Sequence, residues 1–64
     1  MGNFIKNPIL LVSILNTKLR DCYPNLENLC DDLDYNKEEI IDFLYSSGYQ
    51  YDSNLNQFKL IMGD

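Results

Sequence analysis

Ten acidic side chains and no histidine define the chemistry that this sequence of 64 residues could carry. Six of the carboxylates cluster in one segment: Asp31, Asp32, Asp34, Glu38, Glu39 and Asp42. Such a cluster could bind a cation or supply paired acids for hydrolysis. However, its spacing lacks the alternating oxygens and turn glycine of a calcium loop, and no nucleophile stands beside a base. We therefore expect a solvated acidic surface, with no catalytic residue, no metal site and no cofactor.

The two cysteines, Cys22 and Cys30, offer a second kind of chemistry. A secreted domain of this size usually carries four or more cysteines, and two cysteines without histidines do not make a zinc site. We expect two reduced thiols, one at a helix end and one in the core. A redox switch between Cys22 and Cys30 is the alternative, although Asp31 and Asp32 would raise the pKa of the Cys30 thiol.

The composition is typical of one small soluble domain spanning residues 1–64, with a formal net charge of -5 and 45% hydrophobic residues. The longest apolar run, residues 9–12, is far shorter than the ~20 residues of a membrane span. The N-terminal residues do not show the basic region and apolar stretch that are typical of a secretory signal, so we expect a cytoplasmic protein. A chain this short leaves little room for a deep substrate cleft, so we do not expect an enzyme.

Capping residues and hydrophobic periods predict a mainly α (α+β) fold with a C-terminal β-hairpin. Asn7, Asn25 and Asn36 are good N-caps, and Pro8 suits the first position of a helix. After Gly48 the hydrophobic period changes from helical to alternating, which is typical of strands. The predicted helices span residues 8–21, 26–33 and 37–46, and the predicted strands span about 49–52 and 57–61.

The first predicted helix has the widest apolar face. Five of its residues follow helical spacing: Ile9, Leu11, Val12, Leu15 and Leu19. Leu10 and Ile14 widen this stripe, so we expect the first helix to be central and the most buried of the three.

The segment from Leu26 to Gly48 resembles a helix-turn-helix motif. Its apolar positions are occupied by Leu29, Leu33, Ile40 and Phe43, with Tyr35 in the turn. Cys30 stands where the motif needs a small residue, whereas Asp34 replaces the usual turn glycine, a position that Asp tolerates. With a helix before it and a hairpin after it, the whole chain resembles a winged-helix domain. That resemblance implies DNA binding through the second helix of the motif.

The charges of this segment disagree with DNA binding. From Glu27 to Asp42 there are seven acids and one lysine, a local charge of -6. The cations Lys6, Lys18 and Arg20 lie on or before the first helix, and Lys59 lies on the hairpin. Because affinity for DNA depends on cations that neutralise phosphates, a DNA-binding regulator would need a basic surface assembled in a dimer.

The chain also resembles a family of short uncharacterised bacterial proteins, catalogued as a domain of unknown function. The resemblance covers nearly everything from residue 7 to residue 58 and is carried by six stretches: Asn7-Pro8, Asn16 to Asp21, Leu26 to Leu33, Lys37 to Ile40, Tyr49 to Asp52 and Asn56 to Phe58. It implies a small stand-alone bacterial protein and supplies no activity, substrate or site residue.

Two groups of residues are candidates for binding. The first is an acidic, tyrosine-bearing interaction surface comprising Lys37, Glu38, Ile41, Asp42, Tyr45 and Tyr51. The second is a polar patch of Lys18, Arg20 and Asp21, for which ordinary charges at a helix end are the alternative. We expect a non-enzymatic protein-interaction or regulatory module that binds a protein partner or a second copy of itself. A DNA-binding transcriptional regulator acting as a dimer is the alternative.

Overall fold

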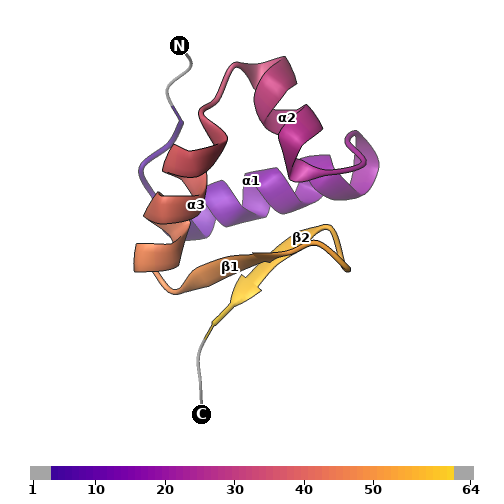
Figure 1. The fold of residues 1–64 in the computed structure, drawn as a ribbon. Helices are drawn as coiled ribbons and strands as arrows, with labels where there is room; N and C mark the ends of the chain where they lie inside the picture. Colours follow the sequence, from indigo (N-terminus) through magenta and orange to yellow (C-terminus); the bar gives the residue numbers. More distant parts are fainter. Residues whose placement is uncertain (1–3, 62–64) are drawn as a thin grey trace.

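Three helices are followed by a two-stranded antiparallel hairpin in the computed structural model, which describes residues 4–61 (Figure 1). The elements are α1 (Pro8–Asp21), α2 (Leu26–Leu33), α3 (Lys37–Ser46), β1 (Tyr49–Asp52) and β2 (Gln57–Leu60). The expected fold class, mainly helical with a C-terminal hairpin, is confirmed.

An asparagine begins each helix. The side chains of Asn7, Asn25 and Asn36 each accept a hydrogen bond from the backbone N–H three residues further on, at 3.1, 2.8 and 3.2 Å. Each cap satisfies one of the N–H groups that a helix start leaves without a partner in the helix. Local sequence therefore determines where all three helices start.

The turn between α2 and α3 is compact and left-handed. Asp34 adopts φ 60° and ψ 40°, the conformation expected of a residue that replaces glycine there. The N–H of Tyr35 then donates to the carbonyl oxygen of Cys30 at 2.8 Å, which closes the end of α2. As a result, α3 leaves the turn in a new direction and packs against both other helices.

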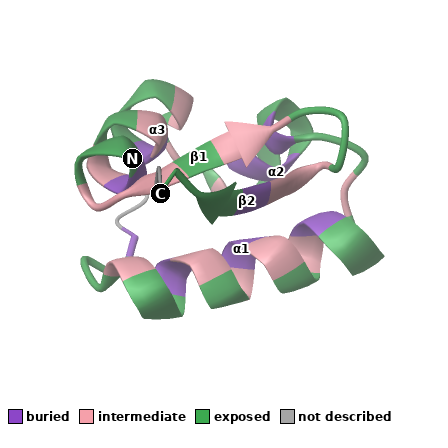
Figure 2. Ribbon diagram, turned by 90° about the horizontal axis from the view of Figure 1, so that it is seen from below, coloured by how far each residue is buried: buried purple, intermediate pink, exposed green. Residues whose placement is uncertain are grey.

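The core lies between the three helices and the hairpin (Figure 2). Its buried residues are Phe4, Leu11, Leu15, Leu19, Leu26, Leu29, Cys30, Ile40, Leu44 and Phe58. Phe4, which precedes every predicted element, packs with its ring 5.6 Å from that of Phe43.

The expectation of a wide buried stripe on α1 is wrong. Leu11, Leu15 and Leu19 are buried, but Ile9 is 71% exposed and Leu10 is 48% exposed. The reason is geometric, because the other elements cover only one side of α1 and leave its opposite side to solvent (Figure 2). α1 is the longest helix, but its apolar face is narrower than its sequence suggests.

The hairpin pairs Tyr51 with Phe58 and Tyr49 with Leu60. β2 lies on the side of α1, and β1 lies on the side of α2 and α3 (Figures 1 and 2). The hairpin therefore has two outer edges with different neighbours.

Candidate interaction surfaces

The exposed face of α3 carries three of the predicted surface residues. Glu38, Asp42 and Tyr45 are all exposed and are spaced at i, i+4 and i+7, so they follow one line along the helix. Ile40 and Leu44, on the opposite side of α3, are fully buried. Tyr45 is 63% exposed, which is unusual for a large aromatic side chain. We call Glu38, Asp42 and Tyr45 the α3 face.

Two other predicted members of this surface are half-buried beside it. The ammonium group of Lys37 lies 3.3 Å from a carboxylate oxygen of Glu27, so this cation is paired with an acid of α2. Ile41 packs against the core. Lys37 and Ile41 are therefore less exposed than the three residues of the α3 face.

Tyr51 has a structural role that the sequence did not reveal. Its ring lies 5.4 Å from the ring of Phe58. Its hydroxyl donates to Oδ1 of Asn56 and accepts a hydrogen bond of 3.3 Å from the backbone N–H of Leu26. The structure therefore separates Tyr51 from the α3 face, because the hydroxyl links the hairpin to the start of α2.

The predicted polar patch divides into an ion pair and a separate lysine. The Nε and Nη2 groups of Arg20 donate to the two carboxylate oxygens of Asp21 at 3.1 and 3.3 Å. This hydrogen bonding, together with the charge of Arg20, lowers the pKa of Asp21. Both partners are exposed, so the pair contributes little to stability. This geometry is that of ordinary charges at the end of a helix.

Most of the cations already have a partner within the chain. Besides Arg20 and Lys37, Lys59 pairs with Asp52 at 3.0 Å, and the ammonium of Lys6 lies 4.1 Å from the centre of the Phe4 ring. Within residues 4–61, Lys18 is the one cation for which no such contact is found. Four of the five cations are therefore already engaged with an acid or a ring of the chain.

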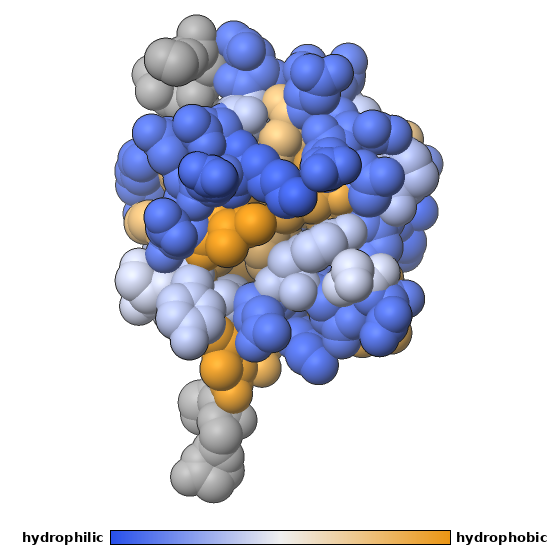
Figure 3. Space-filling model, viewed as in Figure 1, coloured by the Kyte–Doolittle hydropathy of each residue, from blue (hydrophilic) through white to orange (hydrophobic). Residues whose placement is uncertain are grey.

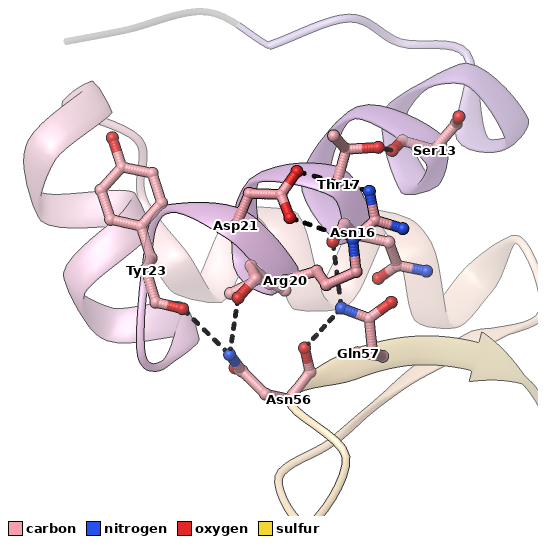
Figure 4. Close-up of polar contacts among 9 residues, drawn as sticks. Ser13, Asn16, Thr17, Arg20, Asp21, Tyr23, Asn56 and Gln57 are labelled. Carbon is pink, nitrogen blue, oxygen red and sulfur yellow. Dashed lines mark hydrogen bonds and ion pairs between the residues drawn. The ribbon is translucent and has the colours of Figure 1, made fainter.

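A network of amide side chains joins the hairpin to α1 (Figure 4). Nδ2 of Asn16 donates to the carbonyl oxygen of Phe58 at 3.1 Å, and Oδ1 of Asn16 accepts from the N–H of Phe58 at 2.7 Å. Nε2 of Gln57 donates to the backbone oxygen of Asn16 at 3.0 Å. Asn16 thus pairs with β2 as a neighbouring strand would.

The other part of this network is the side chain of Asn56, which bonds to carbonyl groups at the C-terminal end of α1. Asn56 adopts φ 55°, and its Nδ2 donates to the carbonyl oxygens of Leu19 and Tyr23, each at 3.0 Å (Figure 4). Both acceptors are carbonyls at or beyond the last turn of α1, where helices leave such groups without an internal partner. The sequence contains one sign that Asn16 faces the rest of the fold. It lies four residues after Val12 and three before Leu19, which places a polar side chain within the apolar face of the helix.

The thiols occupy the two environments expected from the sequence. Cys22, the C-cap of α1, is exposed, and Cys30 is buried. Burial raises the pKa of the Cys30 thiol, and Lys37 partly opposes that shift. The direction matches the expectation, but its main cause is burial rather than the neighbouring acids.

Residues 4–61 contain no candidate metal site, no pocket and no membrane-spanning helix. The acidic and thiol side chains there form no group able to hold a metal ion, and the surface contains no pocket. No helix in this part of the chain is both long and apolar enough to cross a membrane.

Fold and surface together define a small α+β domain that presents an acidic helix face and a hairpin fastened to its first helix. The chain belongs to the family described as Domain of unknown function (DUF4250), whose match covers residues 5–58. No curated protein and no solved structure matches it.

Proposed function

We propose that this chain is a non-enzymatic protein-interaction module, with a regulatory role, that binds a partner through the α3 face. The observation that carries the proposal is the exposure of Tyr45 in line with two carboxylates. Tyrosine is enriched at interfaces because it offers a large apolar ring together with a hydroxyl. Glu38 and Asp42 would select a partner with complementary positive charge.

Helix-turn-helix-like architecture, a cytoplasmic location and a bacterial origin belong to the same proposal. Left-handed Asp34 supports the first, because it permits the tight turn between α2 and α3. The rival proposal, a dimeric DNA-binding regulator, would place α3 in the major groove. That position would bring Glu38 and Asp42 toward phosphates, and the pairing of Lys37 with Glu27 reduces the compensating charge.

Site-specific photocrosslinking tests the proposal. A benzophenone amino acid would replace either Tyr45 or Leu55, which are both 63% exposed but lie on α3 and in the hairpin turn, respectively. In cells that naturally express the chain, we expect one discrete polypeptide to crosslink at position 45 and not at position 55. Equal crosslinking at both positions, or none at position 45, would contradict the proposal.

Affinity measurements with the identified partner complete the test. Asp42→Lys reverses a charge within the α3 face, and Asp31→Lys makes the same change on an exposed position of α2. We expect only Asp42→Lys to weaken binding, by about tenfold. A titration with duplex DNA at low salt should show no binding up to about 100 μM protein, which is weaker than ordinary non-specific affinity. Tight DNA binding would favour the rival instead.

A further inference from the structure

The edge of β1 that faces away from β2 has hydrogen-bonding groups without partners. In an antiparallel pair, opposed residues alternate between those that bond to each other and those whose N–H and C=O point outward. Asn16 bonds both backbone groups of Phe58, so Phe58 and its partner Tyr51 form an outward-pointing pair. The bond of 2.8 Å from the N–H of Ile61 to the oxygen of Gly48 confirms this alternation.

Tyr49 and Tyr51 therefore both direct their backbone N–H and C=O away from β2. Among residues 4–61, no hydrogen bond is found to any of these four groups. They are two residues apart on one strand, which is the spacing at which an added strand forms its bonds. The edge of β1 is thus ready to accept an extended polypeptide.

An apolar strip adjoins this edge. Figure 3 shows apolar side chains sunk between hydrophilic ones over α2 and α3 and paler ones over β1. Ile41 of α3 and Tyr49 and Tyr51 of β1 are each half-buried against the core. A strand added to β1 would bury alternate side chains on this strip.

We propose that the free edge of β1 binds an extended, basic segment of a partner polypeptide as a third strand of the hairpin. This inference rests on the proposed function and adds the conformation and charge of the partner. The charge follows from the neighbours, because the segment containing α2 and α3 carries Glu27, Asp31, Asp32, Asp34, Glu38, Glu39 and Asp42 against Lys37, a sum of -6. A lysine-bearing strand would be attracted to these acids.

The same charges oppose a second copy as the occupant. Two chains joined through their β1 edges would bring two segments of charge -6 toward each other. Their β1 strands, Tyr49–Asp52, contribute no cation to offset the repulsion. An extended basic segment would bond the outward N–H and C=O groups of Tyr49 and Tyr51, and its positive charge would be attracted to the acids of residues 27–42.

A capped heptapeptide of alternating lysine and valine is the probe, titrated into the full chain and followed by the backbone amide signals in NMR. We expect the Tyr49 and Tyr51 amides to shift and to gain protection from exchange, with saturation below about 1 mM. A matched peptide of alternating glutamate and valine should bind at least about tenfold more weakly. Equal binding of the two peptides, or no change at Tyr49 and Tyr51, overturns the proposal.

Methylation of single backbone nitrogens tests the strand geometry, since a 64-residue chain can be made by chemical synthesis. N-methylation at Tyr51 removes an outward donor without touching the ladder to β2, and N-methylation at Leu60 does the same on the opposite edge. We expect about a tenfold loss of affinity for the first and less than a twofold change for the second. The reverse pattern overturns the proposal.

Methylated probes give a measurement that is independent of protein folding. Neighbouring residues of a strand direct their N–H groups to opposite edges, so methylating all valines or all lysines blocks one edge only. We expect one methylated peptide to bind and the other to fail, and equal behaviour would exclude strand addition. Peptide-induced shifts confined to the α3 face would overturn this inference and leave the proposed function standing. Concentration-dependent shifts of Tyr49 and Tyr51 without peptide would show that a second copy occupies the edge, which also overturns it.

Discussion

The two outer edges of the hairpin differ at the pair formed by Tyr51 and Phe58. On β2, the side chain of Asn16 bonds both backbone groups of Phe58 and so takes the place of a neighbouring strand. On β1, the corresponding groups of Tyr51 have no such partner within the described residues. Natural sheets usually protect their edges because an open edge pairs with other chains.

This difference shows that one amide side chain can decide which side of a small sheet is available. α1 lies beside β2 and supplies the amide, whereas α3 lies beside β1 and supplies no side-chain hydrogen bond to Tyr49 or Tyr51 within the described residues. At the Tyr51–Phe58 pair, Asn16 closes the edge beside α1, and the edge beside α3 stays open within the described residues. Variants that remove the side-chain hydrogen bonds to β2 should lower the free energy of unfolding. Blocking the outward groups of β1 should change only the affinity for a partner.

Asn56→Ala should cause the largest loss of stability on the fastened side. The change removes the amide that bonds the carbonyls of Leu19 and Tyr23, removes the acceptor of the Tyr51 hydroxyl, and places alanine at φ 55°. We expect the free energy of unfolding to fall by about 3–4 kcal/mol, measured by urea denaturation. Asn56→Gly relieves the backbone strain and should recover about 1 kcal/mol of that loss. Losses below about 1 kcal/mol in both variants would show that the network is not needed.

Asn16→Ala should have the next largest effect and makes the two edges alike. It leaves the backbone N–H and C=O of the buried Phe58 without partners, at an expected cost of about 2 kcal/mol in urea denaturation. The Phe58 amide should also exchange with solvent faster. Thr17→Ala is the control, because its hydroxyl bonds only within α1, at 3.0 Å to the oxygen of Ser13, and its cost should stay within about 0.5 kcal/mol. An unchanged Phe58 exchange rate would mean that Asn16 does not close this edge.

The sequence contains enough local information to predict the order and type of the elements. Asn7, Asn25 and Asn36 begin helices through bonds that reach only three residues along the chain. The exposure of Glu38, Asp42 and Tyr45 was also predictable, because helical spacing places them opposite Ile40 and Leu44.

Long-range contacts account for what the sequence did not reveal. The partners of Asn16 and Asn56 lie about forty residues away, at separations of 42 and 37 positions, so no local pattern identifies them. Tyr51 looked like a surface residue for the same reason, because its hydroxyl partner is the start of α2. Hydrophobic period alone also could not show that the other elements leave Ile9 and Leu10 uncovered.

A substitution of Asp52 should have the smallest effect on stability, and one that depends on pH, because Asp52 forms an ion pair across the two strands. Its carboxylate pairs with Lys59 across the hairpin and accepts hydrogen bonds from the N–H groups of Asn54 and Leu55. The hydrogen bond from Lys59 is the main cause that lowers the pKa of Asp52. The folded state therefore binds the proton less readily than the unfolded chain does. This contribution to stability is present above the unfolded pKa of about 3.9 and is lost as the pH falls through the lower folded pKa.

Asp52→Asn keeps the oxygen that the turn needs but removes the charge, so it should lower stability slightly at neutral pH and not at all below both pKa values. Urea denaturation at about pH 7 and about pH 2 measures the difference between the two proteins. Asp42→Asn, at an exposed position of α3, is the matched change away from the hairpin. If the difference between Asp52→Asn and the unsubstituted chain is the same at both pH values, the ion pair does not tie the strands. If the stability difference vanishes in acid while the Phe58 amide stays protected from exchange, the hydrogen bonds from Asn16 to Phe58 do not depend on the ion pair between Asp52 and Lys59.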